Sequence, residues 1–283
     1  MQVVYRLWEQ SWEDGAVLKD KETGVFTDPS KVHAVKHDGE YFKLDTVHIC
    51  EPSPQRTPVL FQAGTSDKGL VFAGSHAECV FIGGHSPEAQ AQTVKKLRQE
   101  AVDHGRKPDD LKVFSVITVI VAPTDKEAEE RLQDYKQYGD KKGALALLSG
   151  WTGMDLSKLD MDATVEQVES NAIQSALTAH GAATVREWAD ELTVGGAGEV
   201  LVGSPQTIAD KLQNWFEVSG VDVFNLAYTV MPESVDDFVD MVVPELQGRG
   251  IYKTAYSNGT MRDKLFGEGA RVSASHPAAQ YRA

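Results

Sequence analysis

An alternation of short apolar runs and helical patterns is the feature that most constrains the fold of this chain. Beyond residue 57 the apolar runs are rich in β-branched and aromatic residues, which favour strands. They lie at residues 59–63, 79–82, 113–121 and 221–229, and a segment of helical periodicity follows each one. Strands that are apolar on both faces are covered by helices on both sides, so the alternation predicts an α/β fold with a parallel sheet.

The number of strand–helix units is the second constraint. The sequence contains about four units, whereas a closed (β/α)8 barrel needs about eight. The chain also opens with a helix that no strand precedes, and Val3, Val4, Leu7 and Trp8 fall on one face of it. Both features predict that part of a barrel is missing on the N-terminal side. An open doubly wound sheet is the structural alternative.

Two stretches interrupt the alternation. Residues 13–57 are polar and contain the hairpin signal Asp38-Gly39, so we expect a surface excursion there. Residues 139–203 carry two capping boxes, which begin at Thr164 and Thr184, so we expect a mostly helical insertion.

The C-terminal part continues the same pattern and then loses it. A last helix over residues 233–247 should be kinked at Pro244, because proline cannot donate a backbone hydrogen bond. We expect residues 1–250 to form a single part of a barrel and residues 251–283 to form a tail. Disorder is expected only in its final stretch, residues 268–283.

Composition limits the possible partners and compartment. The net charge of −14 makes binding to nucleic acid or to an anionic membrane surface unfavourable. The apolar runs are too short to span a bilayer, and the first residues lack the pattern of a secretory signal. Cys50 and Cys79 have no metal-ligand spacing. We therefore expect a cytoplasmic protein without a bound metal.

The segment after the first predicted strand is the main candidate for a ligand site. Ligands of parallel α/β folds bind beyond the carboxyl ends of the strands. There, Gly64 permits a sharp turn, Thr65 and Ser66 offer hydroxyl groups, and the following helix offers free amide donors. This combination suits a phosphate group. The alternative is that Ser66 is only the N-cap of the helix, a role in which serine is common.

Three other segments carry weaker signals. Gly83-Gly84 leaves space for a planar ligand and is followed by His85, a possible proton donor, although a plain turn explains the same residues. Residues 147–153 combine apolar bulk with glycines, so they fit a lid or an apolar substrate wall as well as ordinary helix packing. Residues 195–198 are glycine-rich but follow no strand, which argues against a dinucleotide site.

Several motifs together resemble one enzyme family. In order along the chain they are VYRLWE (4–9), VLFQAGTS (59–66), LSGWTG (148–153), VGSP (202–205), DVFNLAY (222–228) and VPELQ (243–247). This set is similar to the nitrilotriacetate monooxygenase component A and long-chain alkane monooxygenase family, which also includes dibenzothiophene sulfone monooxygenase. These proteins are flavin-dependent monooxygenases of the bacterial-luciferase-like type.

The resemblance implies a fold, a cofactor and a reaction. It implies a TIM barrel with insertions, of which this chain holds strands five to eight. It also implies reduced FMN (FMNH2), supplied by a separate flavin reductase, which forms a peroxide adduct with O2 and inserts one oxygen atom into a small organic substrate. Ser66 would lie near the FMN phosphate, beside Gly64 and Thr65. The full-length protein would be a homo-oligomer.

The resemblance leaves the catalytic residues unassigned, because the strands that carry them in the family would precede Met1. Two other functions remain open. One is an inactive barrel fragment that needs a missing N-terminal half or a partner chain. The other is a phosphate-binding barrel with different chemistry, such as an aldolase, which the lack of a suitable lysine on a strand disfavours.

Overall fold

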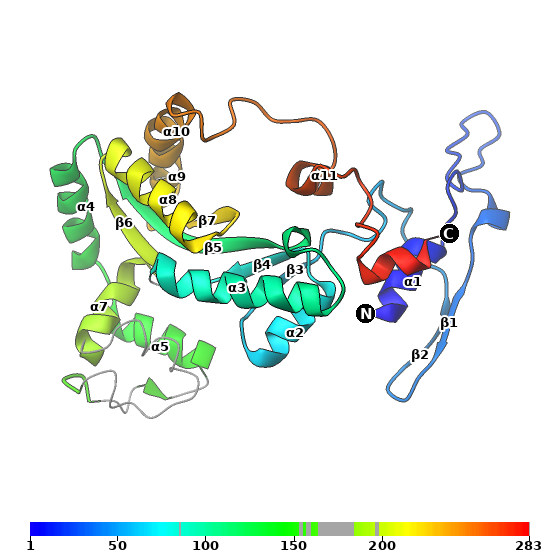
Figure 1. Cartoon of the computed structure of the whole chain (residues 1–283), viewed down its shortest axis with the longest axis horizontal. Coiled ribbons are helices and arrows are strands. Elements are labelled where there is room, and N and C mark those ends of the chain that lie inside the picture. The colour runs from blue at the N-terminus through cyan, green and yellow to red at the C-terminus, as the bar shows by residue number, and fades with distance from the viewer. Residues whose placement is uncertain (85, 153–154, 157–159, 164–183, 196–197, 283) are drawn as a thin grey trace. The chain divides into compact units, whose positions relative to one another are not determined.

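The chain folds into two compact units. The computed structural model, drawn in Figure 1, describes residues 1–84, 86–152, 155–156, 160–163, 184–195 and 198–282. Unit 1 consists of Met1–Val80, Lys96–Lys112 and Tyr256–Ala283, and unit 2 of Phe81–Lys95 and Val113–Ala255. Unit 1 is therefore assembled from three stretches that lie far apart in the sequence.

Unit 1 combines helices with a small antiparallel hairpin. Its helices are α1 (Gln2–Gln10), α2 (Asp67–His76) and α11 (Met261–Phe266), with 3-10 turns at Pro29–Lys31, Pro108–Asp110 and Pro277–Tyr281. Its strands are β1 (Val35–Asp38), β2 (Lys43–Thr46) and β3 (Phe61–Ala63). The hairpin predicted at Asp38-Gly39 is confirmed, since β1 pairs with β2 and Asp38 lies opposite Lys43.

Helix α1 buries a different face from the one predicted. Val3, Val4, Leu7 and Trp8 are only partly buried, whereas Tyr5 and Glu9 are buried. The Glu9 carboxylate accepts hydrogen bonds from the backbone N–H and the hydroxyl of Thr57 and pairs with Arg271. A buried carboxylate needs such partners to offset its lost hydration, and apolar periodicity does not reveal them.

Unit 2 contains most of the parallel sheet and its helices. Its strands are β6 (Glu199–Gly203) and β7 (Val223–Ala227). Its helices are α4 (Asp125–Gln137), α5 (Lys141–Thr152), α7 (Val185–Gly195), α8 (Pro205–Ser219), α9 (Glu233–Asp237) and α10 (Val243–Gly248). Three elements belong to both units: β4 (Cys79–Ile82), α3 (Pro87–Asp103) and β5 (Lys112–Val121). Helices α4 and α8 pack against β6 (Figure 1).

The sheet confirms the α/β prediction and adds one strand to it. The strand order is β3-β4-β5-β6, and β7 also pairs with β5. Strand β5 is parallel to both β6 and β7; it pairs with β7 over Phe114–Thr118 and with β6 over Ile117–Val121. The added strand is β6, at the end of residues 139–203, where the sequence predicted a mostly helical insertion and where helices α5 and α7 also lie.

The structure contains one of the two predicted capping boxes and an irregular helical segment beside Pro244. Thr184 and Glu187 form the predicted capping box of α7: Glu187 accepts from the Thr184 backbone N–H at 2.8 Å, and Thr184 accepts from the Glu187 N–H at 3.2 Å. The box at Thr164 lies outside the described residues. Near Pro244 the last helix passes through a π-helical segment, Phe238–Val242, which fits the predicted kink.

The C-terminal stretch corrects another expectation. Residues 268–283 were expected to be disordered, yet Val272, His276 and Ala278 are buried in unit 1. Val272 and Ala278 form an apolar cluster with Tyr5 of α1. Burial of a few side chains against a distant segment holds this stretch in place despite its polar composition.

None of the helices in the described part of the chain has the length and apolar character needed to span a membrane.

Candidate functional site

The loop between β3 and α2 has the geometry expected of a phosphate-binding turn. Gly64 has φ +106°, a left-handed conformation that favours glycine, and a Cβ added there would meet no atom within 4 Å. Thr65 and Ser66 follow it and are exposed. A ligand therefore has open access to the backbone at this turn.

The structure confirms that Ser66 caps α2. Its Oγ accepts a hydrogen bond from the backbone N–H of Gly69 at 3.2 Å. A hydroxyl group that accepts in this way still has its own proton to donate. The first turn of the helix also leaves the N–H groups of Asp67 and Lys68 without an intrahelical acceptor. The donor set therefore suits an anionic oxygen, and the cap does not exclude ligand binding by Ser66.

The sequence placed Gln62 only within the motif VLFQAGTS (59–66), and the structure shows the contacts of its side chain. Its side-chain amide nitrogen lies 3.3 Å from the carbonyl oxygens of both Gly64 and Gly69. The side chain thus connects the two ends of the loop that contains Thr65 and Ser66. A glutamine directly before Ala63-Gly64 was visible in the sequence, but only the fold shows where its amide points.

The loop that follows β4 contains the second pair of candidate glycines. Gly84 has φ +132°, and Gln90 donates a hydrogen bond to its carbonyl oxygen at 3.4 Å. Gly84 also forms a parallel bridge with Gly198, which precedes β6. His85 lies outside the described residues. The positive φ of Gly84 and its close contacts explain why a glycine is present at this position, without any need for a ligand.

An aspartate joins the loops that follow β5 and β6. Asp125 begins α4, and its carboxylate accepts the backbone N–H of Ser204, the N-cap of α8, at 2.7 Å. Hydrogen bonds from the Ser204 backbone and the Thr207 side chain lower the pKa of Asp125. Gly203 leaves room for this contact, since a Cβ there would lie 3.0 Å from the Asp125 carboxylate and 2.6 Å from Thr207.

A small apolar hollow lies near the carboxyl end of β7. It has a volume of about 150 Å³, and its lining includes Val119, Leu226, Ala227 and Phe238. The segment expected to form a lid or substrate wall, residues 147–153, belongs to helix α5 up to Thr152, and Gly153 lies outside the described residues. The hollow at β7 is an apolar surface beside a strand end, lined in part by Leu226 and Ala227 of the motif DVFNLAY (222–228).

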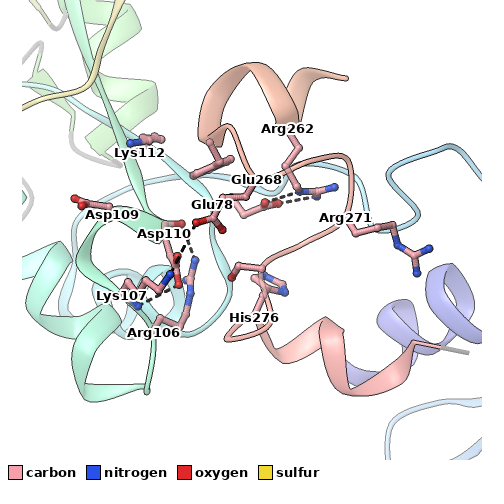
Figure 2. A pocket seen from close by; sticks show the side chains of 12 residues that line it. Glu78, Arg106, Lys107, Asp109, Asp110, Lys112, Arg262, Glu268, Arg271 and His276 are labelled. Atoms are coloured by element: carbon pink, nitrogen blue, oxygen red, sulfur yellow. Dashed lines mark hydrogen bonds and ion pairs between the residues drawn. The ribbon is translucent and has the colours of Figure 1, made fainter. Parts of the chain in front are cut away.

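Unit 1 contains a second, charged hollow of about 220 Å³, shown in Figure 2. Three of the carboxylates that line it have partners. Glu78 pairs with Arg262, Asp110 accepts from the Lys107 backbone and from Ser275, and Glu268 pairs with the Lys107 side chain. Glu78 directly precedes β4, so this hollow lies at the amino end of that strand. The charged groups there hold the fold together, whereas ligands of parallel sheets bind at the other end.

No group of three or more histidine, cysteine, aspartate or glutamate side chains within the described ranges is arranged to hold a metal ion. Two separate candidate regions remain, the loop after β3 in unit 1 and the loops that follow β5 and β6 in unit 2. The residues at these strand ends offer hydrogen-bond donors, an apolar surface and few ionisable groups. Such a set binds and orients a ligand rather than supplying a nucleophile of its own.

Known proteins resemble the chain over its whole length. Dimethyl-sulfide monooxygenase of Hyphomicrobium sulfonivorans is 49% identical over 100% of this chain and 60% of its own length. The crystal structure of DmoA from the same organism matches with a TM-score of 0.92 and covers 100% of this chain and 61% of DmoA. The chain thus spans about 60% of the length of these relatives.

Two more distant matches extend the comparison. Nitrilotriacetate monooxygenase component A of Aminobacter aminovorans is 33% identical over 93% of this chain and 60% of its own length. A crystal structure of riboflavin lyase with modified FMN and riboflavin is 35% identical, with a TM-score of 0.87, and covers 100% of this chain and 64% of the lyase. The resemblance inferred from the motifs is therefore confirmed. Since the sequence model of the luciferase-like monooxygenase family also matches residues 2–222, the chain belongs to that family.

Proposed function

We propose that this chain is part of the barrel of a flavin-dependent monooxygenase, with five strands of the sheet rather than the four expected as strands five to eight, and that it binds the phosphate of reduced FMN at Gly64, Thr65 and Ser66. The observation that carries the proposal is the open, left-handed turn at Gly64 in front of the capped helix α2. This turn lies at the carboxyl end of a parallel strand, where such folds bind ligands. Membership in the luciferase-like monooxygenase family supports the choice of ligand.

The donor set of the loop fits the phosphate end of FMN. The Ser66 hydroxyl and the first-turn amides of α2 provide donors for phosphate oxygens, and the positive end of the helix dipole favours their charge. The structure of the related riboflavin lyase contains modified FMN and riboflavin, which supports a flavin as the ligand. When bound, reduced FMN supplies the reaction with O2 that transfers one oxygen atom to a small organic substrate.

The residues of this chain would bind and orient the reactants and would exclude water. Apolar side chains at the carboxyl end of β7 offer a dry surface of the kind that organic substrates prefer. The Asp125–Ser204 contact fixes two neighbouring loops, which limits their movement around a ligand. No residue of the described chain is assigned a proton-transfer role.

The proposal includes a partner and leaves the substrate open. One relative is named as component A of a monooxygenase, which supports a separate reductase that delivers reduced FMN. The relatives act on chemically different compounds, dimethyl sulfide and nitrilotriacetate, so the family does not determine the substrate. We propose a cytoplasmic protein that forms a homo-oligomer when complete.

A second candidate function is a barrel fragment that is inactive until another chain segment completes it. Among the strands that the structure describes, β7 pairs only with β5, so its other edge has unpaired backbone groups. Beside it lies an apolar hollow of about 460 Å³, whose lining includes Phe216, Phe224 and Tyr252. Phe216 and Tyr252 are exposed. An edge strand next to an apolar hollow is typical of a surface that another segment covers.

One experiment separates the two candidates. The chain is prepared alone and fused to the part of the Hyphomicrobium relative that it does not cover. Both proteins are titrated with FMN and then supplied with reduced FMN, O2 and dimethyl sulfide. Activity of the fusion but not of the chain alone supports a monooxygenase that needs another segment, whereas activity of both proteins would overturn the second candidate. Failure of both proteins to bind FMN would contradict the proposed cofactor.

A further inference from the structure

The side chain of Gln62 forms a bridge inside the proposed phosphate loop. Its Nε2 atom lies 3.3 Å from the carbonyl oxygen of Gly64, 3.3 Å from that of Gly69 and 3.5 Å from that of Ala63. A primary amide has two N–H donors, so it can serve the Gly64 and Gly69 carbonyls together. The bridge spans the segment that contains Thr65 and Ser66.

Gly69 makes this close arrangement possible. A Cβ added at Gly69 would lie 3.0 Å from the Gly64 carbonyl oxygen, 3.2 Å from Gln62 Nε2 and 3.2 Å from Ser66 Oγ. The same position supplies the backbone N–H that Ser66 accepts. Gln62, Gly69 and Ser66 therefore form one packed unit, and a shift of any of them moves the Ser66 hydroxyl.

We infer that Gln62 is a positioning residue that determines the preference of the site for a phosphorylated flavin over an unphosphorylated one. The inference rests on the proposed function, because it assumes that Ser66 and the first turn of α2 meet the phosphate. Gln62 directs its amide protons at loop carbonyls, so it acts through the loop shape rather than by contact with the ligand. Donors that point at a phosphate must be held in place before binding, since a flexible loop loses affinity in becoming ordered.

The test compares FMN with riboflavin, which lacks the phosphate. Gln62→Met keeps the length of the side chain but removes both N–H donors. Gly69→Ala keeps Gln62 but crowds the same three atoms. Gln133→Met is the matched control, because Gln133 on α4 is exposed and bonds only to Glu129. Each protein is titrated with both oxidised flavins by fluorescence, and its melting temperature is recorded.

We expect the wild-type chain to bind FMN more tightly than riboflavin. Both loop variants should lose about tenfold in FMN affinity, which is the effect of one or two lost hydrogen bonds. Their affinity for riboflavin should change by less than about twofold. The control should retain the full preference. Equal loss for both flavins, or no loss at all, would overturn the role of Gln62. If the wild-type chain shows no preference or binds neither flavin, the proposed phosphate site itself fails.

Discussion

The guanidinium group of Arg262 binds both carboxylate oxygens of Glu78, at 2.7 and 2.9 Å, although 184 residues separate the two in the sequence. Arg262 is 2% exposed and donates its remaining hydrogen bonds to the carbonyls of Gln55, Ala270 and Thr57. All five N–H donors of the guanidinium thus have acceptors. The pair ties the C-terminal stretch to the start of β4, as Figure 2 shows.

Arg262→Met should strongly destabilise the protein. The substitution leaves the Glu78 carboxylate buried without its charged partner, which costs about 3–5 kcal/mol of unfolding free energy. Urea denaturation measures the change. Lys36→Met provides the control, because Lys36 and Asp45 form an exposed pair worth at most about 1 kcal/mol. Equal effects of the two substitutions would contradict a structural role for the buried pair.

Ser66→Ala should weaken FMN binding by about 1–3 kcal/mol, because a donor to a charged group is lost. It should also cost about 1 kcal/mol of stability, because the helix loses its cap. Thr124→Ala removes a comparable cap from α4 and should affect stability alone. Flavin titration and thermal unfolding of both variants separate the effects. FMN affinity equal to wild type in Ser66→Ala would remove Ser66 from the site.

Stability should fall as the pH is lowered from about 6.5 to about 4. Burial lowers the pKa of His76 to about 4, and burial also lowers the pKa of His276. Between these pH values the unfolded chain binds protons that the folded chain does not, so acid favours unfolding. Tyr5 lies 3.1 Å from Nδ1 of His76, and the His276 ring bonds to the His76 carbonyl oxygen, a contact that offsets part of the effect of burial on the pKa of His276.

His76→Gln should make this pH dependence shallower, because glutamine does not titrate. The melting temperature is recorded from pH 7 to pH 4 for the variant and the wild type side by side. His37→Gln, on hairpin strand β1, serves as the control and should preserve the wild-type slope. Carboxylates titrate in the same window, so the comparison depends on the difference between slopes. Identical slopes for His76→Gln and wild type would argue against His76.

The chain alone should oxidise no substrate at a useful rate. The free edge of β7 and the apolar hollow beside it favour self-association, and an incomplete pocket admits water to the bound flavin. We expect oligomers on size-exclusion chromatography, and mainly hydrogen peroxide when reduced FMN and O2 are supplied. A soluble monomer that couples oxygen consumption to substrate oxidation would show that the chain needs no further segment.

Local signals predicted the elements whose limits are set locally. Strand β4 has the predicted bounds, because an apolar run defines it, and α2 begins after Ser66, the N-cap that the sequence offered. Strand β6 was missed, because its short apolar run Val200–Val202 becomes a strand only by pairing with β5. The sequence also failed to predict that residues 268–283 are ordered. Their contacts are made with distant segments: His276 bonds to the carbonyl oxygen of His76, 200 residues away.

The candidate site was predictable in position but not in detail. Gly64 and Ser66 were identified from turn and cap chemistry, and the structure gives them that conformation. The contacts of Gln62 and Asp125 depend on side-chain directions and on neighbouring loops, which one sequence does not specify. Hydrogen-bond partners between distant segments are properties of the fold, so they emerge only with coordinates.

The three-part construction of unit 1 has a consequence for biosynthesis. A ribosome releases Glu9 and Glu78 early, but Arg271 and Arg262, which neutralise them, belong to residues 256–283, which are translated only after unit 2. Until then, both carboxylates must remain hydrated, because burying them unpaired is costly. Unit 1 should therefore stay open on the nascent polypeptide and close only once residues 256–283 have emerged. Ribosome-bound intermediates that stop before Arg262 should be sensitive to protease within residues 1–80.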